Sequence, residues 1–252
     1  MEGTAVQRRL IWRFGEVVAA RAETARAKSL TLTVPEWPGH RAGQHVDVRL
    51  TADDGYQAER SYSIASPPED SPKVTITVER LDDGEVSPYL VDEVRIGDRL
   101  ELRGPIGGYF VWEAQMGGPL LLVGGGSGIV PLMAMIRHRK AAGSAVPTRL
   151  LYSSRSSAEV IYRDELENAA RLDGGLKLIY TFTRVQPPGW TGYGRRIDVG
   201  LLGEVAWLAG DHPRAYICGP TPFVETAAAA LVSLGYPDAY VKTERFGPTG
   251  GG

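Results

Sequence analysis

The sequence contains a single cysteine, Cys218, and only four histidines among its 252 residues. One thiol excludes a disulfide framework, a cysteine zinc site and a four-cysteine iron–sulfur cluster within this chain. The histidines stand at no spacing that would bring them around one metal ion, so the sequence predicts no metal site.

An excess of charge of one sign is lacking as well. The chain has 28 Lys and Arg against 30 Asp and Glu, and a net charge of −2 does not favour nucleic acid as a partner. No apolar signal core follows residues 1–9. The uncharged segment from Pro119 to Ile136 has the length of a membrane span, but Gly124–Gly126 and Pro131 interrupt it. We therefore expect a soluble, cytoplasmic protein without a membrane span.

What the sequence does have is a glycine turn at its centre, Gly124 to Pro131, behind the apolar run Pro119–Val123. The order predicts a strand, a tight turn and a helix whose free N–H groups suit a phosphate. The strict G-x-G-x-x-G pattern ends on Pro131 instead of glycine, and the Walker A and G-x-S-x-G patterns fail too. A plain tight turn is the alternative, but three consecutive glycines favour a ligand.

Short runs rich in Val, Thr, Leu and Ile, separated by turn signals, fill the first half and predict an antiparallel Greek-key β-barrel. A short helix capped by Ser87 is expected at 87–93. The predicted strands are Val17–Ala22, Ser29–Val34, His45–Leu50, Arg60–Ile64, Val74–Glu79 and Arg99–Arg103.

Strands and helices alternate in the second half, which predicts a parallel sheet with helices on both faces. The composition changes near Trp112–Pro119, so we expect two domains, 1–114 and 115–252. The predicted strands are Leu120–Val123, Thr148–Ser153, Leu176–Phe182, Arg214–Cys218 and Ala239–Lys242, and the predicted helices are Ile129–Ala142, Tyr162–Leu172 and Pro222–Leu234.

Two segments of the barrel half suggest a second anion site. Arg60 and Tyr62 alternate on one face of a strand, where the guanidinium could pair with a phosphate and the ring could stack on a flat ligand. Gly84-x-Val86-Ser87 is a glycine followed by a Ser-capped helix start. An ordinary strand face and a common hairpin turn are the structural alternatives.

Together these residues make the chain resemble the ferredoxin–NADP reductase family, a flavin-binding barrel followed by a nicotinamide-nucleotide domain. Each motif is short, but six occur in the family's order along nearly the whole chain. They are Arg60-x-Tyr62-Ser63, Gly84-x-Val86-Ser87, Gly104–Phe110, Gly124–Pro131, Tyr216–Pro220 and Glu244–Phe246.

The resemblance implies FAD in the barrel domain. Arg60 and Ser87 would hold its pyrophosphate, with Gly84 and Val86 in the same loop. Tyr62 would stack on the isoalloxazine. Ser63 would lie near N5, which requires the strand to end at Ser63.

The resemblance also places a nicotinamide nucleotide in the second domain, on Gly125, Gly126, Ser127 and Gly128. Cys218, Gly219 and Pro220 would line the gap where its ring meets the flavin. Glu244 would lie near both rings and handle a proton or order the site. Phe246 would cover the flavin face opposite Tyr62, although Gly247–Gly252 follows it, where some family members end on an aromatic residue.

The end of the second predicted strand bears on the choice of nucleotide. Tyr152–Arg155 offers no acid to a ribose 2′-OH, and Arg155 and Arg163 could pair with a 2′-phosphate. By resemblance, Arg184 would reach the nucleotide as well. We therefore expect NADP(H), with Glu159 between the two arginines weakening the case and NADH as the alternative.

The leading functional hypothesis is an FAD-dependent NAD(P)H reductase that passes electrons to a separate protein, such as a ferredoxin or the redox subunit of an oxygenase or molybdenum enzyme. One alternative is a reductase of small molecules such as free flavin or ferric siderophores. Another is a non-catalytic flavin or nucleotide module that docks on a larger complex. The catalytic residues that the first two require would be Ser63, Cys218 and Glu244.

Overall fold

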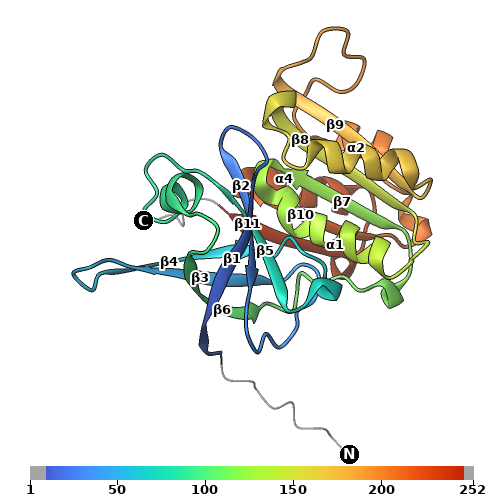
Figure 1. Ribbon diagram of the computed structural model, residues 1–252. Coiled ribbons are helices and arrows are strands. Elements are labelled where there is room, and N and C mark those ends of the chain that lie inside the picture. The colour runs from blue at the N-terminus through green and yellow to red at the C-terminus, as the bar shows by residue number, and fades with distance from the viewer. Residues whose placement is uncertain (1–9, 247–252) are drawn as a thin grey trace, which may run out of the picture.

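The structure, a computed structural model, describes residues 10–246 and contains two β-sheets that lie side by side (Figure 1). The predicted tail Gly247–Gly252 lies outside the described residues. No helix within residues 10–246 is both long and apolar enough to cross a membrane.

The first sheet is six-stranded and antiparallel, in the order β4-β3-β6-β1-β2-β5. A bridge between Ile64, directly after β4, and Ile76 of β5 brings the two edge strands together and closes the sheet into a barrel. Its core is apolar and includes Leu30, Val46 and Leu102. The strands are β1 (Trp12–Ala22), β2 (Ala27–Thr33), β3 (His45–Thr51), β4 (Gln57–Ser63), β5 (Lys73–Glu79) and β6 (Arg99–Ile106).

The second sheet is five-stranded and parallel, in the order β11-β10-β7-β8-β9, and it has an apolar core on each face. Helices α1 and α2 cover the face towards the viewer in Figure 1, and α3 and α4 cover the other. The elements are β7 (Leu120–Gly125), α1 (Ile129–Ala141), β8 (Thr148–Ser156), α2 (Arg163–Leu172), β9 (Leu176–Val185), α3 (Val199–Val205), β10 (Arg214–Pro220), α4 (Thr221–Ser233) and β11 (Val241–Phe246).

One helix is missing from the sequence predictions, and two local predictions are wrong. Helix α3 was not expected; Asp198 caps it by accepting a hydrogen bond from the Leu201 amide at 2.7 Å. The last strand begins at Val241 rather than Ala239 and runs on to Phe246. The short helix expected at 87–93 is present, mostly as a π-helical turn at Tyr89–Glu93, but Ser87 does not cap it, because its hydroxyl accepts a hydrogen bond from the Leu81 amide at 3.0 Å.

The two sheets share an interface formed mainly by α1 and the connection before β7. Tyr216 of β10 donates a hydrogen bond to the Val111 carbonyl at 2.7 Å, and its ring meets Phe110 edge to face. His138 of α1 lies 2.7 Å from Glu69 Oε1 of the barrel domain. These contacts hold the end of β4 close to the parallel sheet, where the predicted site lies.

Candidate active site

Strand β4 ends at Ser63, as the predicted position of this serine near a ligand requires. Ser63 pairs with His45 at the start of β3, and Tyr62 pairs with Val46. The Tyr62 side chain is half-buried against the barrel core, and this burial raises the pKa of its hydroxyl. Tyr62 therefore stays neutral at ordinary pH and offers an apolar ring face.

Arg60 and the loop that contains Gly84 come together from distant parts of the barrel. The Arg60 guanidinium lies 3.0 Å from Glu85 Oε2, and Tyr56 donates a hydrogen bond to the other oxygen of Glu85. Val86 is fully buried in the barrel core, so only its backbone is available to a ligand. The two barrel motifs thus form one surface, with Glu85 beside the arginine expected to bind a phosphate.

Glu244, Cys218 and Gly124 stand in one row across three neighbouring strands, because Cys218 of β10 is in register with Glu244 of β11 and with Gly124 of β7. Side chains in register on parallel strands point to the same face of a sheet. The thiol of Cys218 and the carboxyl of Glu244 are therefore neighbours.

Glu244 also reaches the barrel domain, with Oε1 lying 4.0 Å from Nδ1 of His45. Its second oxygen, Oε2, is buried without a hydrogen-bond partner. Burial raises the pKa of Glu244 to about 7 and lowers that of His45. Burial, and secondarily the charge of Glu244, raises the pKa of the Cys218 thiol. The carboxyl can accordingly take up or release a proton near neutral pH, whereas the thiol is not a nucleophilic thiolate.

The glycine turn itself has two positions that favour glycine, for different reasons. Gly126 has a φ of 56°, in the left-handed region, with open space where a side chain would start. A Cβ on Gly128 would stand 2.1 Å from the Cys218 carbonyl oxygen, so this glycine lets α1 begin directly against β10. Ser127 is half-buried between them.

A side chain that the sequence did not indicate, Phe223, lies over this turn. A Cβ on Gly219 would approach its ring to 2.7 Å, and one on Gly125 to 3.0 Å. Phe223 belongs to the first turn of α4, directly after Pro220. Two of the predicted nucleotide-binding glycines therefore also make room for this ring.

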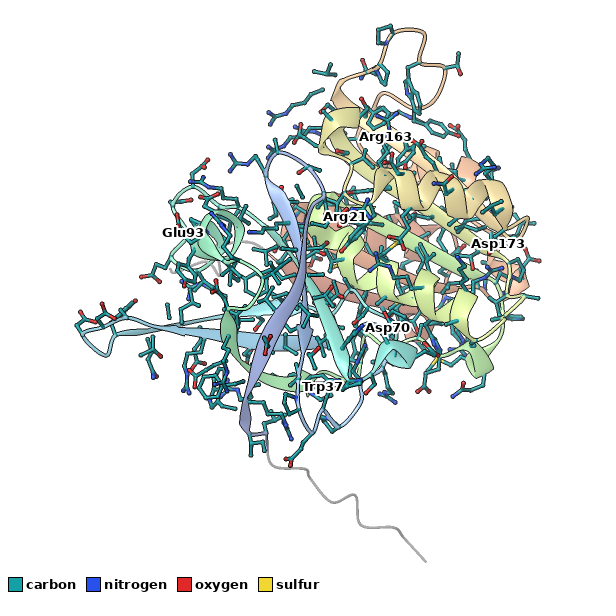
Figure 2. All side chains as sticks on the ribbon, in the orientation of Figure 1. Arg21, Trp37, Asp70, Glu93, Arg163 and Asp173 are labelled. Atoms are coloured by element: carbon teal, nitrogen blue, oxygen red, sulfur yellow. The ribbon has the colours of Figure 1, made fainter. Side chains whose placement is uncertain are left out.

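The two arginines expected near a 2′-phosphate, Arg155 and Arg163, and Arg184, expected to reach the nucleotide, lie at or near the carboxyl ends of β8 and β9 and are exposed. Arg155 lies 3.9 Å from Glu159, and Arg163 donates a 2.9 Å hydrogen bond to Glu167. Arg163 is the first residue of α2, and Figure 2 shows it at the end of the helix opposite Asp173. Arg184 is the second-last residue of β9.

His45 is the main residue that sequence analysis missed. It was treated as an ordinary histidine, although it begins a predicted strand two positions before Asp47 on the same outward face. The sequence holds no signal that this face meets β11. Phe246, in contrast, lies at the end of β11 beside Pro220, which is compatible with its predicted place at the flavin.

Two family models match the chain. Residues 18–111 match the oxidoreductase FAD-binding domain and residues 122–229 the oxidoreductase NAD-binding domain. Ferredoxin–NADP reductase B from Sorangium cellulosum is 35% identical over 209 residues, which cover 81% of this chain and 84% of that protein. This chain belongs to the ferredoxin–NADP reductase family.

The two matches give this ferredoxin–NADP reductase family member an FAD-binding and a nicotinamide-nucleotide-binding domain of the oxidoreductase type. The chain is also 32% identical to the ferredoxin reductase component of 3-ketosteroid-9-alpha-monooxygenase from Mycolicibacterium smegmatis, covering 92% of this chain. It spans 64% of the length of that relative.

Solved structures agree on the fold. A ferredoxin NADP+ reductase from Neisseria gonorrhoeae, solved with FAD and NADP, superposes with a TM-score of 0.79 at 21% identity, covering 93% of this chain and 98% of that one. The FAD/NAD-binding domain of nitric oxide dioxygenase from Vibrio cholerae gives 0.83 at 24% identity, covering 94% and 99%. At these identities the likeness shows the two-domain fold alone.

The residues present fit both cofactors of the family. The glycine turn leaves open space at Gly126, and Glu244, which lies 4.0 Å from His45 across the domain boundary, has a second oxygen that is buried without a hydrogen-bond partner. The exposed Arg60 and the half-buried Tyr62 ring suit a phosphate and a flat conjugated ring.

Proposed function

We propose that this chain is an FAD-dependent NAD(P)H reductase that passes electrons to a separate redox protein. The observation that carries the proposal is the meeting of Ser63, His45, Cys218 and Glu244 at the domain boundary, with residues from both sheets. FAD, when bound, accepts a hydride from the nicotinamide and gives up electrons one at a time. We also propose a domain division at residues 114/115, which falls in the gap between the two matched segments, 18–111 and 122–229.

The chain's own residues would bind, orient and exchange protons. Arg60 and the Gly84–Ser87 loop would hold the flavin pyrophosphate, while Tyr62 and Phe246 would cover the ring. The glycine turn at Gly125–Gly128, with Cys218–Pro220, would position the nicotinamide. Correct placement of the two rings supplies most of the acceleration in such a reaction.

Glu244 would take up the proton that the reaction releases. Oxidation of a dihydronicotinamide by two one-electron acceptors releases one proton overall, and a carboxyl with a pKa of about 7 can take it up. Its closeness to His45 gives that proton a second basic atom 4.0 Å away.

A separate protein acceptor is supported by the names of several relatives. They are reductase components of a 3-ketosteroid monooxygenase, a propane monooxygenase and a glycine betaine monooxygenase. We propose an oxygenase or ferredoxin partner by the same route, and NADP(H) as nucleotide because of Arg155, Arg163 and Arg184. The cytoplasmic location expected from the sequence stays a prediction.

A visible spectrum of the purified protein tests the proposal. We expect a flavin spectrum that NADPH bleaches and that a protein acceptor restores. A protein that stays colourless with added FAD would contradict it. Reoxidation by free flavin or ferric siderophore as fast as by a protein would favour the small-molecule reductase, and bound flavin that no nicotinamide reduces would leave a docking module.

A further inference from the structure

Arg137 of α1 reaches across the domain boundary to the strand end that carries Ser63. Its guanidinium donates a 2.8 Å hydrogen bond to the carbonyl of Ala65, two residues beyond Ser63. The same group donates bonds of 2.8 and 2.6 Å to the two oxygens of Glu165 in α2. Such a bidentate pair fixes the plane of the guanidinium as well as its position.

The ring of Tyr162 also contacts the guanidinium of Arg137. The guanidinium carbon of Arg137 lies 4.9 Å from the centre of the Tyr162 ring. The buried hydroxyl of Tyr162 donates a hydrogen bond to Thr77 of β5, in the barrel domain. Tyr162 has a φ of 61°, a conformation that a bulky residue keeps only where its surroundings hold it. Arg163, expected at the nucleotide, follows it directly.

Directed bonds add to the apolar packing that holds the two domains together at this place, where Ala27 and Ala65 of the barrel share a buried cluster with α1. A groove of about 300 Å³ opens here, lined by polar groups that include Ser29, Ser66 and Arg137. Two further lining residues, Arg21 and Asp70, are labelled in Figure 2. The Ala65 amide donates to the Thr75 carbonyl at 2.7 Å, so both polar backbone groups of Ala65 are held.

We propose that Arg137 and Tyr162 form a brace that sets the position of the Ser63–Ala65 segment relative to the nucleotide domain. Both are positioning residues, because they act through the Ala65 carbonyl and through Thr77. The brace links the segment expected to contact the flavin to the start of α2, expected to contact the nucleotide. Its role in the reaction rests on the proposed function.

Arg137→Met tests the brace, with Arg139→Met as the matched control. Arg139 lies on the same helix, is 4% exposed, and bonds only within the nucleotide domain, to the Val146 carbonyl and Asp173. Both variants should lower the melting temperature. Only Arg137→Met should raise the FAD dissociation constant, by about tenfold, in a fluorescence titration of flavin-depleted protein. Equal weakening in both variants, or none in Arg137→Met, would overturn the brace.

Two further variants keep the test decisive. Arg137→Lys retains the charge but loses the planar fork, and it should weaken FAD by a smaller factor. Tyr162→Phe should lower kcat for NADPH about fivefold with KM within twofold, because it removes the bond to Thr77 that aligns the two domains and leaves every residue expected at the nucleotide in place. Its control is Tyr180→Phe, which removes a hydroxyl without a partner. A rise in KM alone would contradict the positioning role. If FAD binds but NADPH does not reduce it, the proposed function fails while the FAD titrations still decide the brace.

Discussion

Glu244 is half-buried and one of its oxygens is buried without a hydrogen-bond partner, and both features follow from its place within β11. A carboxyl whose pKa is raised on folding holds its proton longer in the folded than in the unfolded protein. Its contribution to stability is therefore fully present below pH 4.5 and is lost as the pH rises to about 7.

Glu244→Gln should accordingly remove a pH dependence of stability. We expect the free energy of unfolding of the wild type, relative to the variant, to fall by at most about 3 kcal/mol between pH 4.5 and pH 8. Urea unfolding at both pH values measures it. The exposed Glu225 provides the control, since Glu225→Gln should show no such difference. Parallel curves for wild type and Glu244→Gln would remove the inferred burial effect.

Arg155 decides the choice between the two nucleotides if it binds a 2′-phosphate. Arg155→Ala should raise KM for NADPH about ten- to hundredfold and leave KM for NADH nearly unchanged, because a charge-assisted hydrogen bond is lost only with NADPH. Glu159→Gln, which removes the neighbouring carboxylate charge, should lower KM for NADPH instead. Equal loss for both nucleotides in Arg155→Ala would exclude the 2′-phosphate role.

Gly128, at the junction of β7 and α1, lies so close to β10 that any side chain at this position would break the contact. Gly128→Ala should destabilise the protein by about 3 kcal/mol, because its Cβ would overlap the Cys218 carbonyl. It should also slow flavin reduction, since Cys218 and Glu244 stand in register. Gly126→Ala, facing open space, should cost only about 1 to 2 kcal/mol for its backbone conformation. Chemical denaturation compares the two; equal costs would show that the close approach is relaxed elsewhere.

The outer face of the barrel carries a cluster of oppositely charged side chains that pair with one another. Arg49 pairs with Glu101 and Arg103 with Asp47, and both guanidinium groups lie over the ring of Trp12, at 4.1 and 4.7 Å. Opposite charges on adjacent strands stabilise one another across the sheet. This face therefore satisfies its own charges.

The two domains should respond to FAD together, because Tyr216, His138 and Arg137 all bond across their interface. FAD at a hundredfold excess over its dissociation constant should stabilise the protein by about 2.7 kcal/mol and raise the melting temperature by roughly 5 to 10 °C. Calorimetry of the flavin-depleted protein with and without FAD measures this. Two unfolding transitions, of which FAD shifts only one to higher temperature, would show that the nucleotide domain unfolds independently.

Much of this architecture was predictable because its signals are local. The strands of the barrel, the strand–turn–helix at Gly124 and the end of β4 at Ser63 all follow from short apolar runs and the turn residues between them. Helix α3 was not predictable in the same way, because it spans only seven residues and the main sequence signal for it is one capping residue, Asp198. Ser87 carried a helix-cap signal, but its hydroxyl bonds to Leu81, six residues earlier.

Sequence order alone determined the two-domain fold and the types of group available to a flavin and a nicotinamide, since periodicity and motif spacing depend only on neighbours along the chain. Tertiary structure decided three contacts: the pairing of Glu244 with His45, the packing of Phe223 over the glycines, and the hydrogen bond from Arg137 to Ala65. The residues of each pair lie far apart in sequence or come from different elements, and their burial and distances exist only once the two sheets meet. In the proposed function, the glycine turn is therefore one wall of a site whose proton chemistry depends on the opposite domain.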